Sequence, residues 1–222
     1  GGDASLTYGQ TSRNDGETYN FNGSYGTKLG QSGSIVFSAV VSERKKTNRS
    51  KDHNLDIFGD DFAYDFADDP DAARAADDAK IAALGLSRKD FRFQIGDAAI
   101  KNQQFFVNAE TAINDRLDFY SFGGVSLRQG NGFGFRRLPS ELSEDALKIY
   151  PNGFQATLKS NVNDYSNSTG LRYSYDGWKV DLSNTFGLNS FKYDLENSIN
   201  QSLGLNSPTD FYAGKHQFLQ NT

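Results

Sequence analysis

Hydrophobic and polar residues alternate over several long stretches, and this period of two constrains the fold more than any other feature of the sequence. Successive side chains of a β-strand point to opposite faces of the sheet, so such alternation is typical of a two-faced strand. Between residues 178 and 188, one face would carry Trp178, Val180, Leu182, Phe186 and Leu188, and the other Lys179, Asp181, Ser183 and Thr185. Similar alternation covers residues 18–29, 34–44, 104–113 and 117–128.

The alternating segments predict an all-β fold of eight strands, at about residues 3–12, 17–29, 34–46, 102–113, 115–129, 164–175, 178–188 and 210–222. The connections between them alternate in length. Short turns rich in Gly, Asn and Asp are expected at residues 29–33, 113–115 and 175–178. Long loops are expected at about 47–101, 130–163 and 189–209. The exception is residues 12–16, a short turn on the long-loop side.

Composition excludes several classes of protein. No Cys is present, which excludes a disulfide framework and Cys-ligated zinc, and the net charge of -5 argues against nucleic-acid binding. The mean hydropathy of -0.64 is polar, and no run approaches the roughly 18 apolar residues of a membrane helix. Barrel strands keep a low average hydropathy even in a membrane, because their lumen-facing residues are polar. Residues 1–3 have neither the basic start nor the apolar run of a signal peptide.

Strand length and aromatic placement favour a membrane barrel. The predicted strands reach about ten residues or more, as a tilted membrane strand requires. Aromatic residues lie near the ends of the apolar face, as in an interfacial girdle: Tyr19, Tyr25, Tyr173, Tyr175 and Trp178. We therefore expect an antiparallel transmembrane β-barrel segment in a bacterial outer membrane, with its long loops extracellular. The alternatives are a passive porin or adhesin barrel, and a soluble secreted β-rich binding domain.

Local motifs, taken in order, resemble the barrel of TonB-dependent receptors, the plugged active transporters of the outer membrane. Near the start, the motifs are Leu6-Thr7-Tyr8-Gly9-Gln10, Asn14-Asp15-Gly16, Leu29-Gly30, Ser42-Glu43-Arg44 and Thr47-Asn48-Arg49. In the middle they are Tyr120-Ser121-Phe122-Gly123-Gly124 and Ile149-Tyr150-Pro151-Asn152-Gly153-Phe154. The closing run comprises Asn163-Asp164-Tyr165-Ser166, Gly177-Trp178, Asp181-Leu182-Ser183, Asn197-Ser198-Ile199-Asn200, Leu203-Gly204 and Ser207-Pro208-Thr209-Asp210-Phe211.

The resemblance covers nearly the whole chain and implies that residues 1–222 are the N-terminal portion of a barrel of about 22 strands. It further implies energised uptake of a scarce ligand, such as a siderophore, corrinoid, oligosaccharide or peptide. The implied partners are the plug and remaining strands of the same receptor, the TonB complex acting through the plug, and outer-membrane lipid and lipopolysaccharide. The plug itself is absent from these 222 residues.

Charged residues on the predicted lumen side are candidates for contact with the plug: Arg44, Glu110, Asp118, Arg128, Arg172 and Asp181. Arg136 and Arg137 follow a Gly-rich run in the second long loop. They would contact an anionic ligand or lipopolysaccharide phosphate, since Arg grips such groups through two hydrogen bonds, or they would anchor the loop through neighbouring acids. The sequence leaves both interpretations open.

The stretch from Asp56 to Asp78 is rich in aspartate: Asp60, Asp61, Asp65, Asp68, Asp69, Asp71 and Asp77 lie between them. We interpret it as a solvated extracellular loop in which Pro70 starts a short helix reaching Ile81, with Ca²⁺ binding as the alternative. His53 and His216 are too few and too far apart for a metal triad, and no nucleophile-elbow or nucleotide-binding spacing occurs. We expect no enzyme, no cofactor and no metal site.

Overall fold

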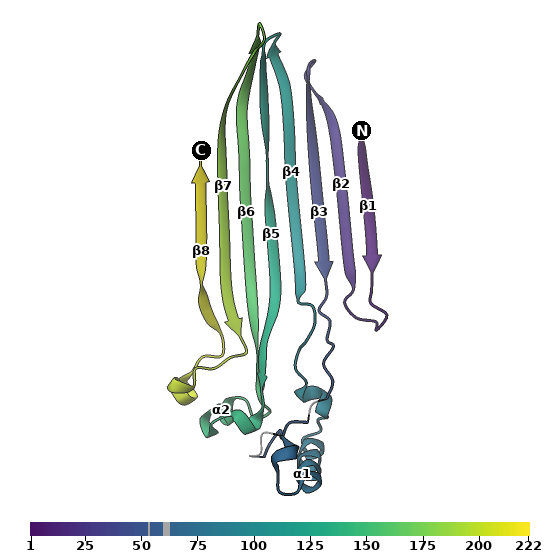
Figure 1. Cartoon of the computed structure of the whole chain (residues 1–222), viewed down its shortest axis with the longest axis vertical. Coiled ribbons are helices and arrows are strands. Elements are labelled where there is room, and N and C mark those ends of the chain that lie inside the picture. The colour runs from purple at the N-terminus through teal and green to yellow at the C-terminus, as the bar shows by residue number, and fades with distance from the viewer. Residues whose placement is uncertain (53, 60–62) are drawn as a thin grey trace.

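Eight strands lie side by side in chain order in one antiparallel sheet of the computed structural model, which describes residues 1–52, 54–59 and 63–222 (Figure 1). The strands are β1 (Gly2–Gly9), β2 (Thr18–Leu29), β3 (Gly33–Arg44), β4 (Ala99–Asn114), β5 (Leu117–Arg137), β6 (Phe154–Tyr175), β7 (Trp178–Glu196) and β8 (Phe211–Asn221). The sheet is open, with β1 and β8 at its two edges. The prediction of eight antiparallel strands is confirmed.

Short turns gather at one end of the sheet and long connections at the other (Figure 1). The turn between β6 and β7 consists of Asp176 and Gly177, both with positive φ (46° and 80°). A two-residue hairpin turn of this kind matches the twist of the flanking strands, and Asp-Gly tolerates its left-handed backbone. The short first connection, residues 10–17, lies at the long-loop end, as expected.

Two of the predicted long loops are shorter than the sequence indicated. Residues 130–137 continue β5 and residues 154–163 belong to β6, so the loop expected at 130–163 is reduced to 138–153. Likewise β7 continues to Glu196, which leaves 197–210 in place of 189–209. Backbone pairing holds these extensions, for example Gly132 with Leu158 and Tyr193 with Ser160. Backbone pairing does not require hydrophobic and polar side chains to alternate. Segments rich in glycine or in polar residues can therefore form strands that the sequence pattern does not indicate.

The β3–β4 connection, residues 45–98, folds into a small unit of its own. Its helix α1 (Pro70–Ala83) is capped at its N-terminus by Asp69, whose side chain accepts a hydrogen bond from the Ala72 N–H at 3.0 Å. The predicted short helix from Pro70 is thereby confirmed. Two 3₁₀ turns, η1 (Tyr64–Phe66) and η2 (Arg88–Phe91), flank α1.

A small apolar core joins this unit to the next long loop. It consists of Ile57, Ile81, Phe91 and Leu138, each almost completely buried. Leu138 belongs to the β5–β6 connection, which also contains η3 (Pro139–Glu141) and a second helix, α2 (Glu144–Ile149), that the sequence did not indicate. The Ser140 N–H donates to the Ile57 carbonyl at 3.0 Å. The two loops therefore pack as one body beyond the end of the sheet.

The third long loop contacts the second. The Tyr150 hydroxyl donates to the Ser198 carbonyl at 3.3 Å, and α2 lies against η4 (Gln201–Asn206) of the β7–β8 connection. The loops together form what we call the loop cap, residues 45–98, 138–153 and 197–210 (Figure 1). Within the described part of the chain, no helix is long and apolar enough to cross a membrane.

Candidate functional site

The register of the strands assigns every strand residue to one of two faces, because directly paired residues of an antiparallel sheet point the same way. One row of pairs joins Tyr25, Phe37 and Val107. We call this side the apolar face. The next row, one residue along, joins Val36, Asn108 and Phe122, and we call that side the charged face.

Charges are segregated between the two faces. The rows of the apolar face from Leu117–Tyr173–Val180 to Phe21–Val41–Gln103 contain no charged side chain among the described strand residues. Over the same span the charged face carries Asp3, Lys28, Glu110, Asp118, Asp164, Arg172 and Asp181. The apolar face is thus fit to meet an apolar medium, and the charged face is fit to meet water or polar groups.

Aromatic rings lie at both ends of the apolar face. Trp178 pairs with Tyr175 at the turn end, and Tyr8 pairs with Tyr19 at the loop end with their ring centroids 5.2 Å apart. Toward the loop end, the first charged side chains on the apolar face are Glu43 and Lys101, which lie in the same row as Tyr19. The apolar band therefore has aromatic borders, beyond which charged side chains begin.

Near the turn end, the charged face holds a cluster of four predicted site residues. Asp118, Arg172 and Asp181 occupy one row on β5, β6 and β7, and Glu110 lies on β4 in the next row. Arg172 Nε lies 3.6 Å from Asp181 Oδ2. A depression of about 170 Å³ lies over this cluster, lined by Glu110, Asp118 and Arg172 among others. Three carboxylates around one guanidinium leave the cluster with excess negative charge.

Tyr120 completes the cluster, and the sequence analysis named it only within a motif, not as a site residue. Its hydroxyl donates to Asp181 Oδ1 at 2.8 Å, and the Arg172 guanidinium lies 5.1 Å from its ring centroid. The ring lies over Gly170, its direct partner on β6, where an added Cβ would be 2.5 Å from the Tyr120 hydroxyl. A glycine opposite an aromatic residue in neighbouring strands is the signal that could have revealed it.

The other two predicted residues of this face lie apart from the cluster. Arg44 is at the loop end of β3, where Nη2 donates to the Ala98 carbonyl at 3.4 Å and Nη1 lies 3.8 Å from Asp97 Oδ1. Arg128 pairs in register with Asn102 and Val162 near that same end. All six predicted residues therefore share one face, as the alternation indicated, but they do not form one site.

Arg136 and Arg137 are the last two residues of β5, not loop residues as predicted. Arg137 Nη1 lies 3.4 Å from Glu141 Oε1, and Glu141 also accepts the Leu138 N–H at 2.7 Å. Arg137 thus has the anchoring role that was one of the two interpretations. Arg136 differs, because it donates to the Asn152 carbonyl at 3.2 Å and has no carboxylate within ion-pair distance in the described part of the chain.

Several described aspartates of the acidic stretch bind protein groups. Asp77 is buried and accepts hydrogen bonds from the Ile57 and Phe58 N–H groups (2.6 and 3.1 Å) and from the Tyr64 hydroxyl (2.6 Å). Asp78 pairs with Arg88 at 2.7 Å. No group of three potential metal ligands occurs among the residues that the structure describes. Asp60, Asp61 and His53 lie outside those residues.

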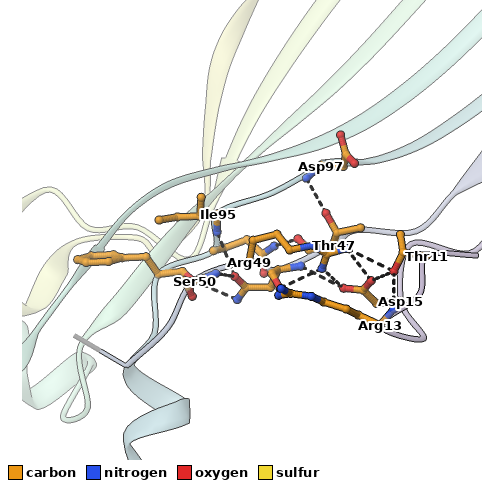
Figure 2. Close-up of polar contacts among 11 residues, drawn as sticks. Thr11, Arg13, Asp15, Thr47, Arg49, Ser50, Ile95 and Asp97 are labelled. Atoms are coloured by element: carbon orange, nitrogen blue, oxygen red, sulfur yellow. Dashed lines mark hydrogen bonds and ion pairs between the residues drawn. The ribbon is translucent and has the colours of Figure 1, made fainter.

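A polar junction at the root of the loop cap was not predicted (Figure 2). Asp15, in the β1–β2 turn, accepts hydrogen bonds from Arg49 in the β3–β4 connection and from the Thr11 hydroxyl. These contacts hold the pKa of the Asp15 carboxyl well below its usual range. Thr47 extends the junction, since its hydroxyl accepts the Asp97 N–H at 2.9 Å and its N–H donates to the Asp97 carbonyl at 3.2 Å.

Comparison with known proteins gave no match to any family model, curated protein or solved structure.

Proposed function

We propose that this chain forms part of the wall of a bacterial outer-membrane β-barrel, with the apolar face toward lipid and the charged face toward the lumen. The observation that carries the proposal is the segregation of charge, since seven charged residues of the strands lie on one face over the span in which the other has none. Lipid penalises charge at the middle of a barrel's outer face but tolerates it in the lumen. Aromatic borders such as Trp178 and Tyr19 support the same orientation.

Strand dimensions support the proposal as well. A tilted strand needs about 9–11 residues to cross the hydrocarbon core. β5 has 21 residues and β6 has 22, so both exceed that need and would project beyond the membrane. Their projecting ends carry the loop cap, which would then lie on the extracellular side.

We further propose that the barrel belongs to a TonB-dependent receptor that takes up a scarce ligand. This step rests on the resemblance of the motifs to that family. The charged face would then contact the plug, with the Glu110, Asp118, Arg172 and Asp181 cluster as one contact and Arg44 and Arg128 as another. The plug would in turn engage the TonB complex. A siderophore, corrinoid, oligosaccharide or peptide remains the range of ligands.

The open sheet edges add a requirement. β1 and β8 each present unpaired backbone groups on one side, and lipid does not tolerate such edges. The proposal therefore requires further strands of the same receptor beside both of them.

Two neighbouring substitutions in β4 test the orientation. Val107 lies on the apolar face and Asn108 on the charged face. In the intact protein, Val107→Lys should reduce folding into bilayers, because a lysine at the middle of the lipid-facing side costs about 2–4 kcal/mol. Asn108→Lys should fold like the wild type. Equal sensitivity at both positions, or protein released from membranes without detergent, would sink the membrane proposal in favour of a secreted β-rich domain.

Ionic conductance distinguishes a passive porin from a plugged receptor. The intact protein in a planar bilayer should pass little ionic current, because a plug fills the lumen. Large, steady single-channel currents would favour the porin alternative and leave the barrel orientation unaffected.

A further inference from the structure

A small pocket opens where β5 leaves the sheet and enters the loop cap. Its volume is about 140 Å³. Apolar walls come from two connections, Leu55 and Phe93 from the β3–β4 loop and Leu138 from the β5–β6 loop, together with Phe135 at the end of β5. Phe135 is 83 % exposed, so one wall faces solvent. Arg136, Arg137 and Glu141 supply the charged part of the lining.

The two arginines of the pocket have different partners. Glu141 neutralises Arg137. Arg136 is half-buried, its guanidinium lies 5.4 Å from the Phe91 ring centroid, and its Nη2 donates to the Asn152 carbonyl. Its buried Nε has no hydrogen-bond partner among the residues that the structure describes. Among the described residues, Arg137 therefore has a direct ion pair, whereas Arg136 has none and is attracted only by the more distant Asp90 carboxylate.

A guanidinium without a direct ion pair beside apolar walls favours a particular kind of ligand. Removing a charge from water is costly unless an opposite charge approaches it, and a carboxylate matches the planar donor edge of arginine. Apolar walls would in turn favour an apolar group attached to that carboxylate. At about 30 Å³ for each water molecule, the pocket has room for roughly four or five waters, which is close to one aromatic ring bearing a carboxylate.

We propose that this pocket binds an aryl carboxylate group, with Arg136 holding the carboxylate and Phe93, Phe135 and Leu138 surrounding the ring. The inference deepens the proposed function and rests on it, because it names the chemical class of ligand that the loop cap of the receptor takes. It also explains why two adjacent arginines have different environments, with Arg137 fixing the loop and Arg136 left for the ligand.

The test uses fluorine NMR with para-fluorobenzoate as the probe and the intact detergent-solubilised protein as the receptor. The wild type should broaden the probe signal, and unlabelled benzoate should reverse the broadening. Arg136→Ala should weaken binding roughly tenfold or more, since hydrogen bonds to charged groups are the stronger ones. The matched control is Lys148→Ala, which removes an exposed charge of the same sign from the loop cap outside the pocket lining and should leave the affinity within about threefold.

Three results would overturn the inference: no broadening by the wild type, an equal loss in Arg136→Ala and Lys148→Ala, or equally tight binding of para-fluorobenzyl alcohol, which has the ring without the charge. Arg136→Lys guards against misfolding, because it keeps the charge without the planar fork and should retain part of the affinity. If the probe-binding test fails while Val107→Lys and Asn108→Lys give the expected results, only the proposed class of ligand is rejected. Failure of that pair would reject the membrane barrel instead.

Discussion

Arg49 and Asp15 form a two-pronged ion pair, with Nη1 2.5 Å from Oδ2 and Nη2 2.9 Å from Oδ1 (Figure 2). The pair joins the β1–β2 turn to the first residues of the β3–β4 connection, more than thirty positions later in the chain. Parallel charge-assisted bonds of this kind fix orientation as well as distance. Asp15 therefore anchors the loop cap to the sheet at the point where the cap begins.

Removing Arg49 should loosen the root of the cap. In Arg49→Ala, the backbone amides of Thr47 and Asn48 should exchange hydrogen faster, because the ion pair that orders the turn against the loop is lost. Hydrogen–deuterium exchange with mass spectrometry measures this in the intact protein. Arg13→Ala is the matched control, since Arg13 is exposed and its hydrogen bond to Thr11 comes from its backbone N–H, which the substitution keeps. Unchanged protection in Arg49→Ala would show that the ion pair does not order the root.

Mild acid should leave this junction intact. The pKa of Asp15 lies below its usual range, chiefly because Arg49 and then Thr11 hydrogen-bond the charged carboxylate. A depressed folded-state pKa means that the stabilisation is present above the unfolded pKa and is lost only as pH falls through the lower folded value. The protection of Thr47 and Asn48 should therefore persist to pH values at which an ordinary aspartate, with a pKa of about 3.9, is half-protonated. Loss of protection near pH 5 would contradict this assignment.

Much of the sheet could be predicted from the sequence because one physical signal, alternation, acts wherever the two faces meet different media. Val180, Leu182, Lys179 and Asp181 follow it, and their faces in the structure are those expected. The signal fades where both faces are polar. Residues 189–196 continue β7 through backbone pairing, and backbone pairing does not require a regular pattern of side-chain types in the sequence.

The site was less predictable, because its decisive contacts join residues that are distant in sequence. Nothing near Arg136 and Arg137 distinguishes one from the other. The two arginines differ because their side chains meet different partners: Arg137 lies near Glu141, and Arg136 lies against Phe91. Tyr120 likewise gains its role only from its pairing with Gly170 and its contact with Asp181.

Asp77 should be the most sensitive residue of the loop cap. It is almost completely buried and accepts three hydrogen bonds, so Asp77→Ala would leave buried donors unsatisfied and should destabilise the β3–β4 unit by about 3 kcal/mol. Local opening would then rise roughly a hundredfold. Trypsin cleavage at Arg74 and Lys80 of α1 measures it. Asp71→Ala, at an exposed position of the same helix, should cleave near the wild-type rate. Equal cleavage of both variants would refute the role of Asp77.

Strong alkali should open the same unit through Tyr64. Burial, followed by the hydrogen bond to Asp77, raises the pKa of the Tyr64 hydroxyl to about 12. An unfolded tyrosine titrates near pH 10, so the folded unit retains a proton that the unfolded chain releases. Its stability is therefore fully present below about pH 10 and falls as pH rises toward 12. Trypsin cleavage should increase over that window in the wild type and less steeply in Tyr64→Phe, and identical pH profiles would disprove the linkage.

The single tryptophan provides a direct measure of how the sheet sits in lipid. Trp178 begins β7, pairs with Tyr175 on the apolar face and is 75 % exposed. In the proposed orientation its ring lies in the interface between hydrocarbon and headgroups. Lipids brominated near the headgroup should therefore quench its fluorescence more strongly than lipids brominated at the chain ends. The double variant Trp178→Phe with Lys179→Trp moves the only tryptophan one residue along, to the charged face, where a water-soluble quencher should act and brominated lipid should not. Equal lipid quenching of both proteins would mean that the two faces do not meet different media.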